Sequence, residues 1–82
     1  PVIDDAILVW GGIESVLSPL MRQVEDKLPG VKTFSLPFLG SENVRAHVEL
    51  GVRGEPVQVP QAMEMLYQGV RAFGYQFDPK AT

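Results

Sequence analysis

The chain has 82 residues, a net charge of −3 and no cysteine, with 45% apolar and 21% charged residues. This length suits one small domain, and the composition is that of a globular protein rather than a disordered one. The missing cysteines exclude disulfides, thiolate nucleophiles and cysteine-bound zinc, and they fit the reducing cytoplasm, where we expect the protein to act. The lack of a basic block argues against nucleic acid as a partner. No apolar run approaches the ~20 residues of a membrane span, so we expect no membrane partner.

Residues 6–10 form the first predicted strand, an apolar run that ends at two glycines and is too short for a helix. The following segment predicts an amphipathic helix that ends at Leu28. A helix that begins near Ile13 would be bent at Pro19, whereas Ser18 as N-cap would put this proline at the favoured first position. We expect a short first turn and then a main helix from about Ser18. Its apolar stripe consists of Ile13, Val16, Leu17, Leu20, Met21, Val24 and Leu28.

Two alternating segments predict an antiparallel hairpin. The first, residues 31–39, contains Pro37, which cannot donate to a strand ladder and therefore indicates an edge strand or one that ends nearby. Residues 40–43 predict the turn, and residues 44–53 the second strand. In the first strand, one side carries Phe34, Leu36 and Phe38, and the other side carries Thr33 and Ser35. In the second, one side carries Val44, Ala46, Val48, Leu50 and Val52, and the other side carries Arg45, His47, Glu49 and Arg53.

A loop after Gly54 leads into a second predicted helix, with Pro60 in its first turn and Gly74 as its C-terminal cap. Residues 75–77 predict a last short strand, followed by a polar tail at residues 78–82. The buried stripe of this helix consists of Val59, Ala62, Met63, Leu66, Val70 and Phe73.

The resulting order, β-α-β-β-α-(β), predicts a ferredoxin-like α+β sandwich, in which an antiparallel sheet carries both helices on one face. The first and third strands are central in this topology, which suits a first strand that is apolar on both faces. We expect one domain over residues 1–82, with its core at residues 6–77. Because the chain begins at Pro1 rather than at methionine, we expect it to be a fragment of a longer protein.

Arg45, His47, Glu49 and Arg53 share one side of the second hairpin strand and are the candidate surface residues. A functional interpretation makes His47 a general base that Glu49 orients. The alternative, which we favour, is a solvated outer sheet face, because strand alternation alone explains every position. The sequence has no G-x-S-x-G motif and no second histidine for a metal triad. We therefore assign no catalytic residue, no metal ligand and no cofactor.

Aromatic residues are numerous for so small a domain: four Phe, two Tyr and one Trp. A domain of this size cannot bury them all, so we expect some apolar surface to be exposed. Such a surface favours docking, onto a parent domain or onto a second copy of the chain.

Two short stretches resemble a known family. Glu14-Ser15, at the start of the first helix, is similar to its E-S motif, and Ser35 and Pro37 match its (G)-S-x-P motif. Residues 10–73 resemble the small domain that follows the molybdopterin-binding-like domain in competence/damage-inducible CinA-type proteins, and the related segment of eukaryotic FAD synthases.

This resemblance implies a cytoplasmic protein whose larger N-terminal domain hydrolyses nucleotide pyrophosphates, such as ADP-ribose or FAD, with a divalent metal. The catalytic residues of that domain do not map onto this chain. Only the four motif positions are carried over, with no role assigned to them. Phe34 stands where a glycine is common before the serine, which puts in question any close backbone approach at that point.

The leading hypothesis is therefore a non-catalytic accessory or docking domain of a CinA-like or molybdopterin-binding-like protein. Its partner would be the N-terminal domain of the parent protein, a second copy, or both. The rival is a small-molecule-sensing regulatory module of the ACT type, which has the same topology and pairs its sheets edge to edge. A third hypothesis is a small enzyme that uses His47 and Glu49.

Overall fold

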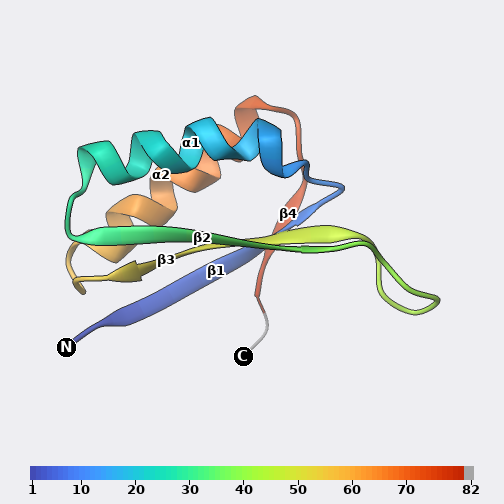
Figure 1. Cartoon of the computed structure of the whole chain (residues 1–82), viewed down its shortest axis with the longest axis horizontal. Helices are drawn as coiled ribbons and strands as arrows, with labels where there is room; N and C mark the ends of the chain where they lie inside the picture. Colours follow the sequence, from blue (N-terminus) through green and yellow to red (C-terminus); the bar gives the residue numbers. More distant parts are fainter. Residues whose placement is uncertain (81–82) are drawn as a thin grey trace.

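The computed structural model describes residues 1–80, and it has the predicted architecture (Figure 1). The elements are β1 (Ile3–Trp10), α1 (Glu14–Lys27), β2 (Val31–Phe38), β3 (His47–Gly54), α2 (Gln58–Ala72) and β4 (Phe77–Pro79). The four strands form one antiparallel sheet in the order β2-β3-β1-β4, and both helices cover the same face. The ferredoxin-like α+β sandwich is thus confirmed, with β1 and β3 in the centre. Within residues 1–80, neither helix has the length and apolar composition needed to cross a membrane.

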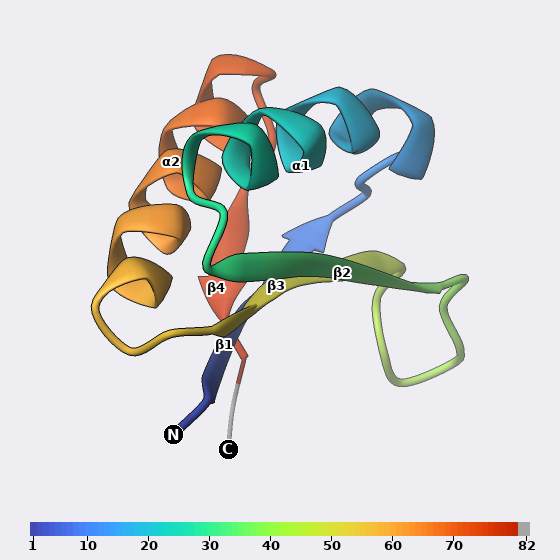
Figure 2. The ribbon, with the colours of Figure 1, turned by 60° about the vertical axis from the view of Figure 1, so that its left-hand side comes forward.

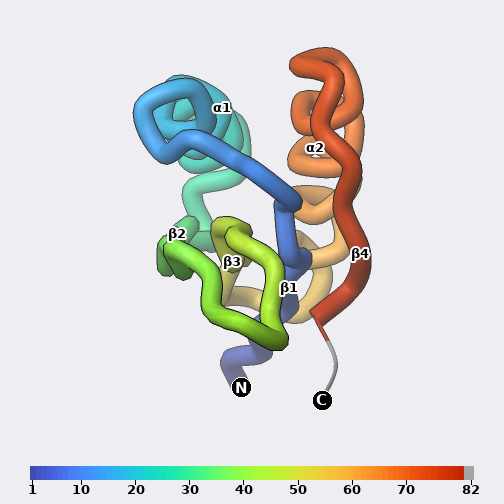
Figure 3. The backbone as a smooth tube through the Cα atoms, turned by 90° about the vertical axis from the view of Figure 1, so that its right-hand side faces the viewer, coloured from blue at the N-terminus to red at the C-terminus, as the bar shows by residue number. Residues whose placement is uncertain are grey.

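The core lies between the two helices and the face of the sheet beneath them (Figure 2). Seen along the strands, α1 lies over β2, and α2 lies over β1 (Figure 3). The buried residues of this layer are Ile7, Val9, Leu17, Leu20, Val24, Val31, Val48, Leu50, Val52, Val59, Ala62, Met63, Leu66 and Val70. Ile13 and Phe73 were predicted in the buried stripes, but they are 55% and 48% exposed because each lies just outside its helix.

α1 begins at Glu14 and continues through Pro19, so the predicted start of the main helix at Ser18 is wrong. Pro19 cannot donate to the carbonyl of Ser15, one turn earlier, but Ser15 is exposed and water can take the place of the missing donor. Instead of capping a helix, Ser18 donates its hydroxyl to the carbonyl of Glu14 at 2.9 Å.

Several strand boundaries differ from the prediction. β1 begins at Ile3 instead of residue 6, because β3 supplies pairing partners as far as Gly54. β3 begins at His47 instead of residue 44, because its partner strand ends at Phe38, which faces His47. The hairpin loop therefore spans residues 39–46. It turns away from the helices in both Figure 1 and Figure 2.

The last strand spans Phe77–Pro79 rather than residues 75–77. Asp78 pairs with Leu8 of β1, so this part of the predicted polar tail belongs to the sheet. Residues 81–82, the end of that tail, lie outside the described residues. Gly74 has a φ of +86° and ends α2, as predicted.

The polar side of β2 faces α1, and its apolar side faces away from the helices. The carboxylate of Glu25 on α1 accepts two hydrogen bonds from Thr33, one from the backbone N–H at 2.8 Å and one from the hydroxyl at 2.6 Å. Ser35 donates to the carboxylate of Glu14 at 2.6 Å. The ring of Phe34 lies over Gly51 on the opposite face, where an added Cβ would also meet the backbone oxygen of the neighbouring strand. In the other strands the apolar side of the alternation faces the helices, whereas in β2 it faces away from them.

The outer edge of β2 is largely closed to further strands. N–H groups of an antiparallel strand point alternately to its two sides. The outward N–H of Val31 is bonded within the preceding turn, and that of Thr33 is bonded to Glu25. Pro37 has no N–H. Of the four outward positions of β2, which are 31, 33, 35 and 37, Ser35 is left with a free N–H. An added strand would therefore find one backbone donor along this edge.

The opposite edge, at β4, is closed in the same way. Trp10 donates to the carbonyl of Gln76 and Lys80 donates to the carbonyl of Ala6, so these even-numbered positions of the last strand face β1. The outward positions are then Phe77 and Pro79, of which only the first has an N–H. Short edge strands with proline are a recurrent means by which proteins prevent sheet extension.

Candidate binding surfaces on the open face

An aromatic row crosses the open face of the sheet, the face that the helices leave uncovered. Phe38 of β2, His47 of β3 and Trp10 of β1 are register neighbours. The ring centroids of Phe38 and His47 lie 5.2 Å apart, and those of Trp10 and His47 lie 5.4 Å apart with the rings nearly perpendicular. Such edge-to-face geometry is favourable for aromatic rings. The row therefore links the three strands across the open face.

The candidate pair His47 and Glu49 lies on this face, as predicted, but its members have different partners. The Nδ1 atom of His47 lies 2.8 Å from the carbonyl oxygen of Arg45. The carboxylate of Glu49 accepts from the ammonium group of Lys80 at 3.0 Å. The carboxylate is thus directed toward the C-terminal strand rather than toward the imidazole. This geometry gives the imidazole no orienting carboxylate of the kind that a general base uses.

Arg53 lies on the same face of β3 as His47 and Glu49, as predicted, whereas Arg45 lies outside the strand. Arg45 lies in the hairpin loop and places its guanidinium over the indole of Trp10, with 5.4 Å from Cζ to the ring centroid. Arg53 pairs with Asp4 on β1 at 3.8 Å, and both side chains are exposed. An exposed pair at this distance contributes at most ~1 kcal/mol.

The structure brings together two of the four positions that carry the family resemblance. Glu14 accepts the hydrogen bond of Ser35, which joins the start of α1 to β2. Ser15 is exposed next to Glu14, and Pro37 is exposed at the sheet edge. The Glu14–Ser35 bond fixes α1 against β2, which is a structural role.

A cluster of exposed apolar side chains covers the end of the hairpin, and we call Leu36, Phe38, Leu39 and Val44 the hairpin patch. Leu39 is 94% exposed and Leu36 is 58% exposed. Beside them lies a shallow groove of about 410 Å³, the hairpin groove. Its lining residues are Leu36, Pro37, Phe38, Val44, His47 and Glu49.

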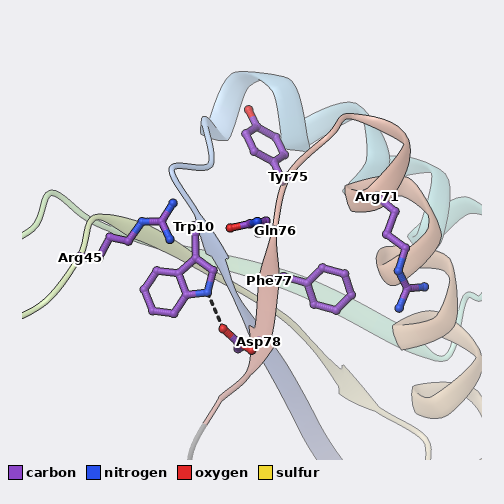
Figure 4. Close-up of a pocket in the computed structure, with 7 residues that line it drawn as sticks. All are labelled: Trp10, Arg45, Arg71, Tyr75, Gln76, Phe77 and Asp78. Carbon is purple, nitrogen blue, oxygen red and sulfur yellow. Dashed lines mark hydrogen bonds between the residues drawn. The ribbon is translucent and has the colours of Figure 1, made fainter.

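A second groove, of about 690 Å³, lies on the other side of the aromatic row and runs around β4 (Figure 4). We call it the arginine groove. Its lining residues are Trp10, Arg45, Arg71, Tyr75, Gln76, Phe77 and Asp78. In Figure 4, Arg45 and Trp10 lie on one side of β4, and Phe77 and Arg71 on the other. The groove is thus built from the hairpin loop, β1, α2 and the C-terminal strand.

Asp78 is held in place by Trp10, whose indole N–H donates to its carboxylate at 2.7 Å (Figure 4). The guanidinium of Arg71 lies over the ring of Phe77, with 5.2 Å from Cζ to the ring centroid. The ring of Phe77 also stacks on that of Tyr67, with 5.4 Å between the centroids. Each arginine of the groove is thus stacked on an aromatic ring.

The sequence pattern indicated Arg45 as a candidate, but it did not indicate Trp10, Arg71 and Asp78. These residues come from separate elements, and no spacing in the sequence connects them. Among residues 1–80, no group of three or more His, Asp or Glu side chains is arranged to hold a metal ion. Comparisons with protein-family models, curated proteins and solved structures each found no match to this chain.

Proposed function

We propose that this chain is a non-catalytic docking domain that associates through the hairpin patch, and that its partner is a second copy of the same domain. The observation that carries the proposal is the exposure of four neighbouring apolar side chains at the end of the hairpin. Contiguous apolar surface of this kind is a common mark of a protein interaction site.

A second copy suits the patch because the patch contains both a projecting side chain and a hollow. Leu39 is almost fully exposed, and it follows Phe38, which lines the hairpin groove. In a two-fold contact the same surface meets itself, so Leu39 of each copy enters the groove of the other. The charged residue of the groove, Glu49, is already paired with Lys80, so docking buries no unpaired carboxylate.

The magnitudes favour a weak dimer. Burying one leucine side chain contributes about 1.5–3 kcal/mol, and the two-fold axis doubles this for Leu39. The rest of the patch adds to that gain, against an association cost of roughly 4–15 kcal/mol. The net gain is therefore small, and we expect a dimer that forms only at high protein concentration.

The closed sheet edges weigh against the rival hypothesis of an ACT-like module. Edge-to-edge pairing needs a row of free N–H and C=O groups, whereas β2 offers Ser35 and β4 offers Phe77 as outward donors. A side-chain contact at the hairpin patch needs no such row. The small-enzyme hypothesis has less support still, because Glu49 is directed toward Lys80 and away from His47.

We also propose, from the resemblance, that the parent protein is CinA-like or molybdopterin-binding-like, with an N-terminal domain that hydrolyses nucleotide pyrophosphates. The bond between Glu14 and Ser35 supports this proposal, since it gives two separate motif positions a shared structural purpose. The complete reading frame tests it. A molybdopterin-binding-like domain before Pro1 is the expected result, and an amino-acid biosynthetic enzyme there would favour the ACT-like alternative.

Sedimentation velocity between ~1 μM and ~1 mM tests the docking proposal. The unchanged chain should move from monomer to dimer over this range, and Leu39→Asp should stay monomeric. Val57→Asp is the matched control, since Val57 is 67% exposed just before α2, and the N-terminal end of α2 lies at the opposite end of the molecule from the hairpin loop (Figure 1). Circular dichroism verifies that both variants fold. A chain that stays monomeric at ~1 mM, or a control that dissociates as Leu39→Asp does, overturns the proposal.

A further inference from the structure

One carboxylate, that of Glu49, lies in the lining of the hairpin groove. The Glu49 side chain is 17% exposed, so the protein already shields it from much of the solvent before anything docks. Burying an ionised carboxylate further costs free energy unless a cation or hydrogen-bond donors compensate its charge. A second copy whose Leu39 covers this groove removes more of the remaining water. Whether the groove accepts Leu39 therefore depends on the group that neutralises Glu49.

Lys80 supplies this cation, and it comes from the other side of β1. Its ammonium group donates to the carboxylate of Glu49 at 3.0 Å. In the strand order β2-β3-β1-β4, β1 separates Glu49 from the end of β4. The backbone N–H of Lys80 donates to the carbonyl of Ala6 on β1 at 3.1 Å, which fixes the point from which the side chain starts. The side chain of Lys80 therefore crosses β1 on the open face to reach Glu49.

The other charged or titratable neighbours of Glu49 on the open face do not replace Lys80. Asp78 lies in the same row of the sheet, on the other side of β1, and is itself a carboxylate. Arg53, four positions along β3, pairs with an aspartate of β1 at 3.8 Å. His47, two positions along β3, directs its Nδ1 atom to a loop carbonyl at 2.8 Å. Compensation of Glu49 thus depends on Lys80.

We propose that Lys80 controls self-association through the hairpin patch, an inference that rests on the function proposed above. With Lys80 in place, Glu49 is neutralised and the groove accepts Leu39 of the second copy. Without it, the carboxylate keeps its hydration water, and the groove disfavours an apolar side chain. Lys80 directly follows β4, a three-residue strand at the sheet edge, so undocking of β4 turns association off. By linkage, the second copy in turn stabilises the docked strand.

Sedimentation velocity up to ~1 mM tests the role of Lys80. Lys80→Gln removes the charge, and dimerisation should then need a protein concentration at least ~ten-fold higher than in the unchanged chain. A two-fold dimer contains the ion pair twice, so both grooves contribute to this loss. Lys80→Arg keeps the charge and should stay within ~three-fold of the unchanged chain. Lys32→Gln removes the same charge from an exposed position at the other end of β2 from the hairpin and should leave the affinity unchanged.

A double variant shows whether Lys80 acts through Glu49. In a Glu49→Gln background the groove has no carboxylate, so adding Lys80→Gln should change the affinity by less than ~two-fold. A merely structural role of Lys80 would produce the same loss in both backgrounds. Undiminished dimerisation of Lys80→Gln, or a loss that persists beside Glu49→Gln, overturns the inference and leaves the docking proposal intact. An unchanged chain that stays monomeric at ~1 mM overturns both.

Hydrogen exchange measures the coupling from the side of the C-terminal strand. The backbone N–H of Lys80 is bonded to the carbonyl of Ala6, so its exchange rate reports the undocking of this strand. Exchange should slow between ~10 μM and ~1 mM protein in the unchanged chain, but not in Leu39→Asp, which should stay monomeric. Equal exchange at both concentrations, in a sample that sedimentation shows to be dimeric at the higher one, contradicts the coupling.

Discussion

Replacing Glu25 by alanine should destabilise the domain, because it removes the acceptor of both Thr33 hydrogen bonds at once. One oxygen of Glu25 accepts from the backbone N–H of Thr33 at 2.8 Å and from its hydroxyl at 2.6 Å. The change therefore leaves two donors without a protein partner on the helix-facing side of β2. One of these two donors, the backbone N–H, is the outward N–H that Glu25 occupies at the sheet edge.

The size of the effect follows from where the bonds lie. A hydrogen bond to a charged group contributes about 1.5–3 kcal/mol when it is shielded from water. Glu25 and Thr33 are only half-buried, so water replaces much of what is lost. We expect a loss of about 1–2 kcal/mol for Glu25→Ala. Glu25→Gln keeps an oxygen acceptor and should lose less than ~1 kcal/mol.

The same bonds make the effect depend on pH. The hydroxyl and then the backbone N–H of Thr33 hold the pKa of Glu25 below its ordinary value of 4.5. The folded state therefore binds this proton less tightly than the unfolded state. The contribution of the ionised Glu25 to folding stability is fully present above pH 4.5, and it is lost as the pH falls through the lowered pKa of Glu25 in the folded state. The stability difference between the unchanged chain and Glu25→Gln should shrink over that acidic window.

Urea unfolding at pH 7 and at several points below pH 4.5 measures both effects. Asp26→Ala is the matched control, since Asp26 is the exposed neighbour on α1 and should change stability by less than ~0.5 kcal/mol. A loss of stability in Glu25→Ala no larger than in this control, or a loss in Glu25→Gln that is the same at every pH, would contradict the role of the Glu25–Thr33 hydrogen bonds.

Three further predictions concern the sheet and the aromatic layer. Leu50→Ala should cost about 2–5 kcal/mol in urea unfolding, since Leu50 is fully buried between the sheet and the helices, and a loss below ~1 kcal/mol would contradict that placement. Gly51→Ala should lower the free energy of unfolding by about 1–3 kcal/mol, because the added Cβ would lie 2.5 Å from the backbone oxygen of Asp5. A second change, Phe34→Leu, should not restore this stability. Full recovery would show that the ring of Phe34 is the only obstacle. Burial, and then the negative charges of Asp5 and Glu64, raise the pKa of Tyr67 above 10.0, so ultraviolet titration should show a transition above pH 10 that is missing in Tyr67→Phe; the same curve for both chains would contradict this.

The order and type of the elements could be predicted from the sequence because each depends on a local pattern. The run at residues 6–10 is apolar on both faces, and it belongs to β1, a central strand of the sheet. Pro37 indicates an edge strand, and it lies in β2, at the edge of the sheet. The helical stripes put Leu20 and Leu66 in one core, as the structure does. These patterns require no knowledge of distant residues.

The orientation of β2 could not be predicted in this way. Alternation separates Phe34 from Thr33 and Ser35, but it does not say which set faces the helices. That choice depends on Glu25 and Glu14, which are 8 and 21 residues away and supply acceptors for the polar set. With the polar set satisfied by α1, the apolar set is left on the open face, where it forms part of the hairpin patch.

The start of β3 and the arginine groove were missed for a similar reason. Alternation continues through Val44 and Ala46, but a strand extends only as far as its partner, and β2 ends at Phe38. The groove combines Trp10 with Arg71 across most of the chain length. The large number of aromatic residues indicated an exposed apolar surface, but not where it would lie.

The most direct test of self-association through the hairpin patch is an isotope-filtered NMR measurement on a mixture of labelled and unlabelled chains at ~1 mM. The two-fold contact predicts intermolecular NOEs from the methyl groups of Leu39 in one copy to the ring protons of Phe38 and His47 in the other. The absence of these NOEs in a sample that sedimentation shows to be dimeric would place the interface elsewhere and contradict the docking proposal.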